Sequence, residues 1–118
     1  MSTQEQHVKS GFFKLAVYTP LEHADAVREA LAQAGAGHIG HYDFCSFSVR
    51  GTGRFRGNAQ ANPAVGVRHE ITAVEEEKIE VIVPERLLKA VLEAVKKVHP
   101  YEEIAMDLYK LEDWGAFL

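Results

Sequence analysis

The chain has little of several features that define common protein classes. Its 118 residues include one cysteine, Cys45, which cannot form an internal disulfide, so a disulfide-stapled secreted fold is excluded. Long apolar runs are also lacking, and the first 19 residues contain charged side chains such as Glu5 and Lys9. We therefore expect neither a secretory signal nor a membrane span, and we predict a cytoplasmic protein with no membrane partner.

Positive charge is scarce as well. The sequence has 13 lysines and arginines against 17 aspartates and glutamates, which gives a formal net charge of −4. Proteins that bind nucleic acid usually carry a basic surplus, so we expect no nucleic-acid partner. A hydrophobic content of 47% supplies one core, and the length is too short for two. We predict a flexible polar tail over residues 1–11 and a single domain over residues 12–118.

Hydrophobic periodicity predicts four strands and two helices. The glycines at 51, 53 and 57 are expected to interrupt regular structure and to begin a long loop that reaches about Val67. Pro20 and Pro84 are expected to close strands, and Pro100 to stop a helix. The predicted strands cover 13–19, 42–50, 71–83 and 104–111, and the predicted helices cover 21–34 and 85–98.

An internal repeat gives the topology. Shifting the chain by 64 positions yields seven identities in 17 positions, among them Pro20 with Pro84 and Val27 with Val91. Each half reads strand, proline, helix, strand, and interleaving two such halves gives a ferredoxin-like α+β sandwich. Its four-stranded antiparallel sheet would carry two helices on one face. The other face would be a bare apolar surface of the kind that marks an interface, so we expect a homo-oligomer.

A cationic segment is the first candidate site. No acidic residue occurs between Asp43 and Glu70, a stretch that holds several arginines and glycines. Glycines allow close backbone approach and arginine forks match carboxylate or phosphate oxygens, so this pattern favours an anionic small molecule. The alternative is a solvated connection whose arginines pair with the acidic run 75–77. The candidate ligand-binding residues are Arg50, Thr52, Arg54, Arg56 and Arg68.

A metal site is the second candidate. On an extended strand His41, Asp43 and Cys45 would point to one side, where they could hold a divalent ion such as Zn or Cu. Their spacing matches no established zinc motif, and a lone cysteine on a strand is commonly a small core residue. His99 and Glu102, at the predicted turn after the second helix, are further candidate ligands, although that turn also has a purely structural interpretation.

Several short motifs together carry a family resemblance over residues 13 to about 111. They resemble the PII/CutA-like domain inserted in bacterial Nif-three proteins and the YqfO-type proteins in which this domain stands alone. The resemblance implies a ferredoxin-like fold, assembly through the sheet, commonly as trimers, and no catalysis. It also implies some association with divalent cations through CutA. The motifs are Gly35-Ala36-Gly37, Ile39-Gly40, Tyr42-Asp43, Cys45-Ser46-Phe47, Gly51-Thr52-Gly53-Arg54-Phe55, Ala61-Asn62-Pro63, Gly66 and His99-Pro100-Tyr101-Glu102-Glu103.

Three functional hypotheses follow. The leading one is a non-catalytic, homo-oligomeric module that binds a small ligand or regulates another protein, with the arginine loop at a cleft between subunits. The second is a divalent-metal-binding module that uses Cys45. The third is a protein–protein interaction module that docks through its open sheet or through Trp114, Phe117 and Leu118. An enzyme is not expected, because no nucleophile, base and orienting group can be named together.

Overall fold

The computed structural model describes residues 11–118. The predicted N-terminal tail lies outside the described residues except for Gly11, whose carbonyl accepts a hydrogen bond from the Glu85 N–H at 2.6 Å. Among the helices of residues 11–118, none is long and apolar enough to cross a membrane.

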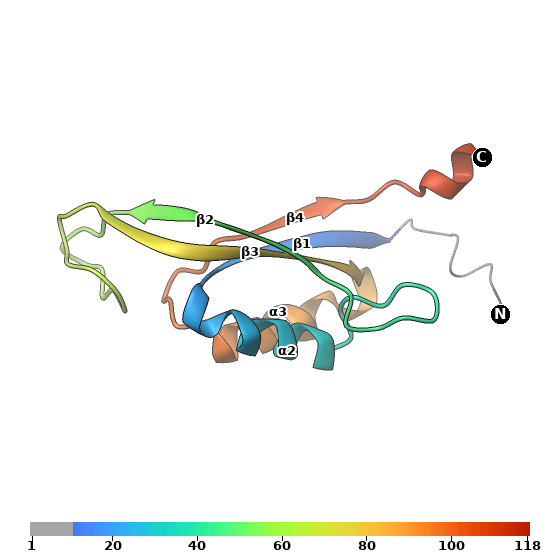
Figure 1. Ribbon diagram of the computed structural model, residues 1–118, viewed down its shortest axis with the longest axis horizontal. Coiled ribbons are helices and arrows are strands. Elements are labelled where there is room, and N and C mark those ends of the chain that lie inside the picture. The colour runs from blue at the N-terminus through green and yellow to red at the C-terminus, as the bar shows by residue number, and fades with distance from the viewer. Residues whose placement is uncertain (1–10) are drawn as a thin grey trace.

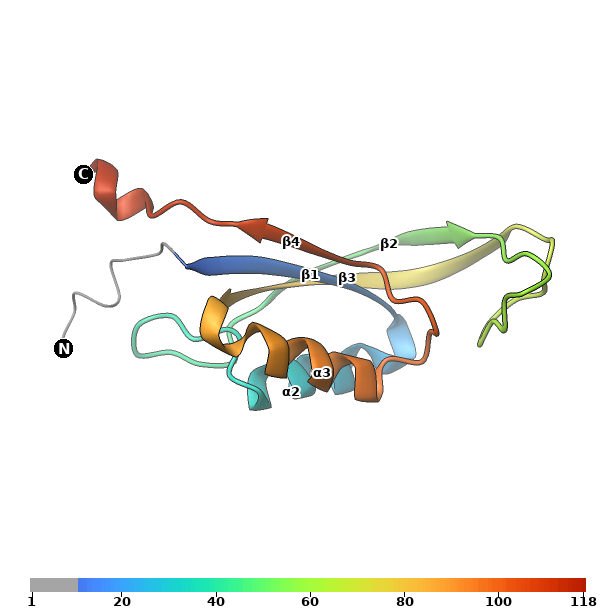
Figure 2. The ribbon, with the colours of Figure 1, turned by 180° about the vertical axis from the view of Figure 1, so that it is seen from behind.

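The predicted ferredoxin-like α+β fold is confirmed. One antiparallel sheet has the strand order β2-β3-β1-β4, and both α-helices lie on one face of it (Figures 1 and 2). The elements are β1 Phe12–Pro20, η1 Leu21–His23, α2 Ala24–Gln33, β2 Phe47–Phe55, β3 Thr72–Pro84, η2 Glu85–Leu87, α3 Leu88–Val98, β4 Met106–Lys110 and η3 Trp114–Phe117.

The two repeated prolines end strands and begin helical segments. Pro20 is the last residue of β1 and Pro84 the last of β3, and each leads into a short 3-10 turn that continues as an α-helix. Proline fixes its own φ and lacks an N–H, so it is tolerated at a strand end and at the entry to a helix. The sequence repeat therefore corresponds to two strand–turn–helix units.

The core lies between the sheet and the helices. Alternate residues of β1 and β3 point toward α2 and α3, as the two-residue period of a strand requires. They meet the apolar stripes of both helices, and all of these side chains are almost completely buried. The central members are Leu15, Val17, Ile79, Val81 and Val83 of the sheet and Val27, Leu31, Val91 and Val95 of the helices.

The prediction for β2 was wrong in its position. Residues 42–46 form no strand, although Tyr42 makes an isolated bridge with Ile39, and β2 continues through Gly51 and Gly53. The long β3 offers a pairing edge from Glu80 to Thr72, and its ladder of hydrogen bonds outweighs the low strand preference of glycine. The long loop consequently starts at Arg56.

The helix-free face of the sheet, expected to be a bare apolar surface, carries charged as well as apolar side chains. Lys78 and Glu80 form an ion pair at 3.3 Å there, and Lys78 also lies over the Tyr18 ring. The Tyr18 hydroxyl donates to the Asp107 carboxylate at 3.3 Å. Strand β2 adds exposed apolar side chains to the same face, because Phe47 lies opposite Glu80 and Val49 opposite Lys78.

An ion pair joins α2 to the middle of the sheet. Arg28 binds Glu77, whose side chain is 11% exposed, and also binds Asp25, whose side chain is 98% exposed. The hydrogen bonds that Arg28 donates to Asp25 and to Glu77 raise the pKa of its guanidinium. Arg50 lies 3.9 Å from Glu77 and is itself largely exposed, so it is a poor substitute partner.

We therefore expect Arg28→Ala to lower the free energy of unfolding by about 3 kcal/mol, because it leaves the buried Glu77 carboxylate without its main partner. Asp25→Ala removes only an exposed partner and is expected to cost less than about 1 kcal/mol. Urea denaturation of the two variants tests this, and equal losses would contradict the assignment of Glu77 as the partner that matters.

Candidate functional site

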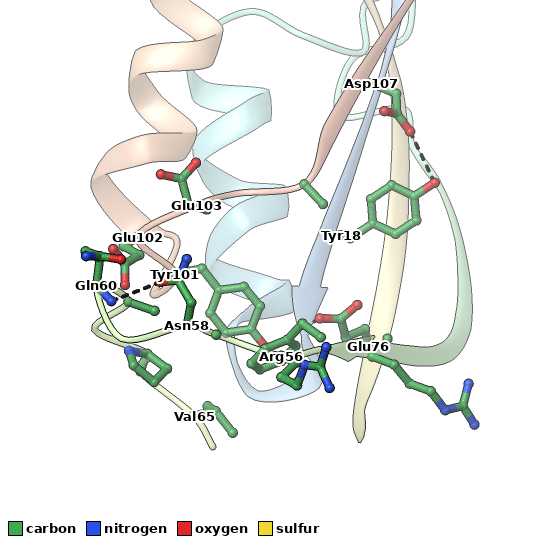
Figure 3. Close-up of a pocket in the computed structure, with 18 residues that line it drawn as sticks. Tyr18, Arg56, Asn58, Gln60, Val65, Glu76, Tyr101, Glu102, Glu103 and Asp107 are labelled. Atoms are coloured by element: carbon green, nitrogen blue, oxygen red, sulfur yellow. Dashed lines mark hydrogen bonds between the residues drawn. The ribbon is translucent and has the colours of Figure 1, made fainter. Parts of the chain in front are cut away.

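A cavity of about 760 Å³ lies at one end of the sheet (Figure 3). Its walls come from the end of β2, from the following loop as far as Val65, and from the turn that leads from α3 into β4. Tyr18 of β1 and Glu76 of β3 form the side toward the sheet. Segments far apart in sequence therefore converge on one volume large enough for a small-molecule ligand.

Tyr101 links two walls of this cavity. Its ring packs edge-on against Phe55, with 5.9 Å between ring centroids, and its hydroxyl donates to the Glu76 carboxylate at 3.4 Å. Burial, reinforced by the negative charge of Glu76, raises the pKa of Tyr101 to about 12. Tyr101 therefore remains a neutral hydrogen-bond donor across the physiological pH range.

Gly53 makes room for Glu76. A side-chain carbon at position 53 would collide with the Glu76 carboxylate, which occupies the space above the glycine. Gly53 and Glu76 both line the cavity. Because Gly53 has no side chain, the Glu76 carboxylate can occupy the space above it at the cavity wall.

The loop over 56–71 is held by its own hydrogen bonds and by Glu102. The Asn62 N–H donates to the Glu102 carboxylate at 2.5 Å, and the His69 N–H donates to the Gly57 carbonyl at 2.7 Å. Arg68 donates to the Ala61 carbonyl. Glu102 and Arg68, which the sequence marked as metal and ligand candidates, thus hold the loop in this structure.

Arg54 and Arg56 are the two predicted ligand residues that line the cavity. Both side chains are exposed, and neither has an ion-pair partner within the described part of the chain. Figure 3 shows the Arg56 guanidinium beside the Tyr101 and Glu76 side chains. Two cationic forks at the rim therefore remain available for an anion.

Two further predicted ligand residues, Arg50 and Thr52, lie on β2 and do not line the cavity. Arg50 faces Glu77, and the Thr52 hydroxyl donates to Glu75 at 3.4 Å. For these two positions the alternative interpretation, pairing with the acidic run 75–77, describes the contacts. Their part in ligand binding stays a prediction.

His99 connects β1 to the turn that forms the cavity wall. Its Nδ1 accepts from the Tyr101 N–H at 3.2 Å, which assigns the proton of the neutral ring to Nε2, and Nε2 then donates to the Tyr18 carbonyl at 2.7 Å. Burial lowers the pKa of His99 and nearby His23 lowers it further, while the Tyr18 carbonyl and Glu76 act in the opposite direction. Both ring nitrogens are engaged, so His99 serves here as a positioning residue.

The predicted metal ligands His41, Asp43 and Cys45 do not share one side of a strand, because β2 begins only at Phe47. The Cys45 thiol donates to the Asp43 carbonyl at 3.8 Å and lines a separate cleft of about 290 Å³ beside α2. Across residues 11–118 no group of three or more His, Cys, Asp or Glu side chains is placed to hold a metal ion. Metal binding through His41, Asp43 and Cys45 stays a prediction.

Sequence reasoning missed the inner wall of the cavity. Tyr18, Glu76 and Asp107 lie on three different strands and have no motif that joins them. Only the register of the sheet, which places Tyr18 opposite Lys78 and Ala16 opposite Asp107, brings Tyr18 and Asp107 to one face.

The His99 contacts predict a pH dependence of stability. In the unfolded chain His99 has the ordinary histidine pKa of 6.5, and in the folded chain its pKa is lower. At pH values between these two pKa values the folded state therefore binds fewer protons than the unfolded state. The stabilisation that neutral His99 gives the folded state is therefore fully present above about pH 6.5, and it is lost as the pH falls below this value. In urea unfolding between pH 8 and pH 5, the wild type is expected to lose more stability than His99→Gln, which cannot titrate. His38→Gln, an exposed position, should behave as wild type.

Comparison with known proteins identifies relatives over most of this chain, although no family model matches it. A Halalkalibacterium halodurans protein named GTP cyclohydrolase 1 type 2 homolog is 49% identical over 106 residues, which are 90% of this chain and 28% of that protein. The Bacillus subtilis protein of the same name is 48% identical over 103 residues, which are 87% of this chain and 28% of that protein.

Comparison with solved structures identifies the same relatives and similar folds. A Bacillus cereus protein related to NIF3 matches with a TM-score of 0.71 and 44% identity, over 85% of this chain and 25% of that one. CutA from Archaeoglobus fulgidus gives a TM-score of 0.63 at 17% identity, over 86% of this chain and 84% of that one. The Bacillus subtilis GlnK–ATP complex gives a TM-score of 0.60 at 17% identity, over 88% of this chain and 84% of that one. These last two likenesses show the fold alone.

The extent of the matches is uneven. Nearly the whole of this chain aligns, but it spans only about 28% of the length of the curated relatives it matches. The similarity therefore concerns one segment of those proteins.

Proposed function

Because this chain is a homologue of one segment of the Nif-three-related proteins, we propose that it is a homo-oligomeric, non-catalytic module that binds an anionic small molecule and regulates or assists a larger system. The observation that supports the ligand is the cavity of about 760 Å³ with Arg54 and Arg56 at its rim. Its volume falls in the usual range for small-molecule sites.

The side chains that line the cavity suit a ligand that is charged at one end. Arg54 and Arg56 can each present two parallel N–H donors to a phosphate or carboxylate group. Phe55 and Tyr101 supply an aromatic wall for an apolar or ring-shaped part of the ligand, and Asn58 and Gln60 add amide donors and acceptors. Such a mixed wall orients a ligand that is charged at one end.

We propose binding without turnover. The name GTP cyclohydrolase 1 type 2 homolog belongs to whole proteins, of which this chain covers 28%. Its cavity is lined by arginines, tyrosines, amides and carboxylates, and no serine, threonine, cysteine or histidine of residues 11–118 is among the lining residues. Incubation of the purified chain with GTP, followed by chromatography of the nucleotide, is expected to return GTP unchanged, and a new product would overturn this part of the proposal.

ATP is a suitable anionic probe, since the structurally similar GlnK was solved as an ATP complex. We expect saturable binding of ATP by calorimetry and at least about 10-fold weaker binding in the Arg54→Ala, Arg56→Ala double variant, because each arginine supplies charge-assisted hydrogen bonds worth about 1.5–3 kcal/mol. Lys89→Ala, Lys96→Ala removes the same charge from the exposed side of α3 and serves as the matched control. Equal weakening in both double variants would indicate nonspecific charge attraction.

Metal binding is the alternative carried over from the sequence. A titration of the wild type and of Cys45→Ser with Zn(II) tests it directly. Tight one-to-one binding that disappears in the variant would favour a metal-binding module, and identical behaviour of the two proteins would rule out Cys45 as a ligand.

A further inference from the structure

The cavity at the end of the sheet holds charges of both signs. Its lining residues include four carboxylates against two arginines, and no lysine or histidine of residues 11–118 is among them, so the lining has a formal charge of −2. A ligand that is only anionic uses the two arginines and leaves the carboxylates uncompensated. A positive group on the same ligand would compensate one of them. The carboxylates are Glu76, Glu102, Glu103 and Asp107.

The two signs do not neutralise each other within the protein. Across residues 11–118 no ion pair joins a lining carboxylate to Arg54 or Arg56, although Figure 3 shows Arg56 beside Glu76. Three of the four carboxylates accept hydrogen bonds from neutral donors instead, namely Glu76 from the Tyr101 hydroxyl, Asp107 from the Tyr18 hydroxyl and Glu102 from the Asn62 N–H. A neutral donor satisfies an oxygen but leaves the negative charge in place.

Glu76 is the carboxylate that the surrounding structure positions. Its half-buried side chain lies in the space above Gly53, and one of its oxygens accepts from the Tyr101 hydroxyl at 3.4 Å. Its other oxygen accepts no hydrogen bond from the part of the chain that the structure describes. A charged donor at that oxygen would form a stronger bond than a neutral one, so Glu76 offers a fixed place for a cation.

Aromatic rings line the cavity together with Glu76. Phe55 and Tyr101 pack edge-on, and the Tyr18 ring lies on the side toward the sheet. The faces of such rings attract ammonium groups. Lys78 illustrates this outside the cavity, because its ammonium lies 5.8 Å from the centre of the Tyr18 ring. Lys78 does not line the cavity and pairs with Glu80, so it does not supply the missing positive charge.

We propose that the ligand is a zwitterion, a small molecule whose phosphate or carboxylate group binds Arg54 and Arg56 and whose ammonium group binds Glu76. This inference rests on the proposed function and names the chemical class of its ligand. The ammonium donates to the second Glu76 oxygen, and the carbons beside it lie against the aromatic wall. Because Arg56 lies beside Glu76, a short chain separates the two charged groups of the ligand (Figure 3).

Matched pairs of ligands test the ammonium site in the wild-type protein. Calorimetry compares 2-aminoethyl phosphate with ethyl phosphate, and 3-aminopropyl phosphate with propyl phosphate. The members of each pair share the phosphate and the chain length and differ in the ammonium group. The wild type is expected to bind at least one amino compound about tenfold or more tightly than its match, because of the charge-assisted bond to Glu76. Equal affinities within both pairs would overturn the proposal.

Glu76→Gln assigns the preference to its residue. Glutamine keeps the size of the side chain and an oxygen for the Tyr101 hydroxyl but removes the charge, so the preference for the amino compounds should disappear while the alkyl phosphates bind no more weakly. Glu75→Gln makes the same change at an exposed neighbouring position that does not line the cavity, and it should keep the preference. A preference that survives Glu76→Gln, or one that both variants lose equally, would contradict the assignment. Circular dichroism checks that the variants are folded, and the wild-type comparison does not depend on them.

A lipid headgroup can carry the same two charges, so the source of the zwitterion needs its own measurement. The protein is expected to remain in the supernatant when vesicles of phosphatidylcholine and phosphatidylethanolamine are sedimented, which supports a free small molecule. Co-sedimentation that 2-aminoethyl phosphate competes away would assign the same site to a headgroup.

The titrations also separate this inference from the proposed function. If ATP or the alkyl phosphates bind through the arginines and the amino group adds no affinity, anion binding stands and the zwitterion is overturned. If neither ATP nor any of the phosphate compounds binds, both proposals are overturned.

Discussion

The structure depends on the length of one strand, β3, which at 13 residues is longer than either helix can cover. It pairs with β1 on one side and β2 on the other. Its C-terminal half buries Ile79, Val81 and Val83 against the helices and so anchors the core. Its N-terminal half projects past them and supports the end of β2, which extends the sheet beyond the region that the hydrophobic core stabilises (Figure 1).

The cavity exists because that projecting part of the sheet is flanked by two irregular segments. The loop after β2 closes one side and the turn after α3 closes the other, and Glu102 ties the two together through the Asn62 N–H. Polar groups inside this region are largely paired, with Tyr101 on Glu76 and His99 on the Tyr18 carbonyl. Within residues 11–118 the two rim arginines, Arg54 and Arg56, have no ion-pair partner, so an anion placed there would displace no internal ion pair.

The helix-free face of the sheet mixes charged and apolar side chains. Lys78, Glu80 and Asp107 lie on it and interact with one another or with Tyr18. The strand register places Phe47 of β2 opposite Glu80 and Val49 opposite Lys78, so both of these exposed apolar side chains lie on the same face.

The sequence by itself determined the α+β class and the two strand–proline–helix repeats, because these follow from local periodicity and proline geometry. Its charge pattern marked Arg54 and Arg56 among five candidate ligand residues, and only the tertiary structure placed these two at a cavity. The sequence misplaced β2, since pairing with β3 overrode the preferences of Gly51 and Gly53. Only the tertiary structure decided that Glu76, Tyr18 and Tyr101 share one cavity and that Cys45 lies apart from it. The physical reason is that strand register and loop closure join residues distant in the chain, whereas sequence patterns report only on neighbours.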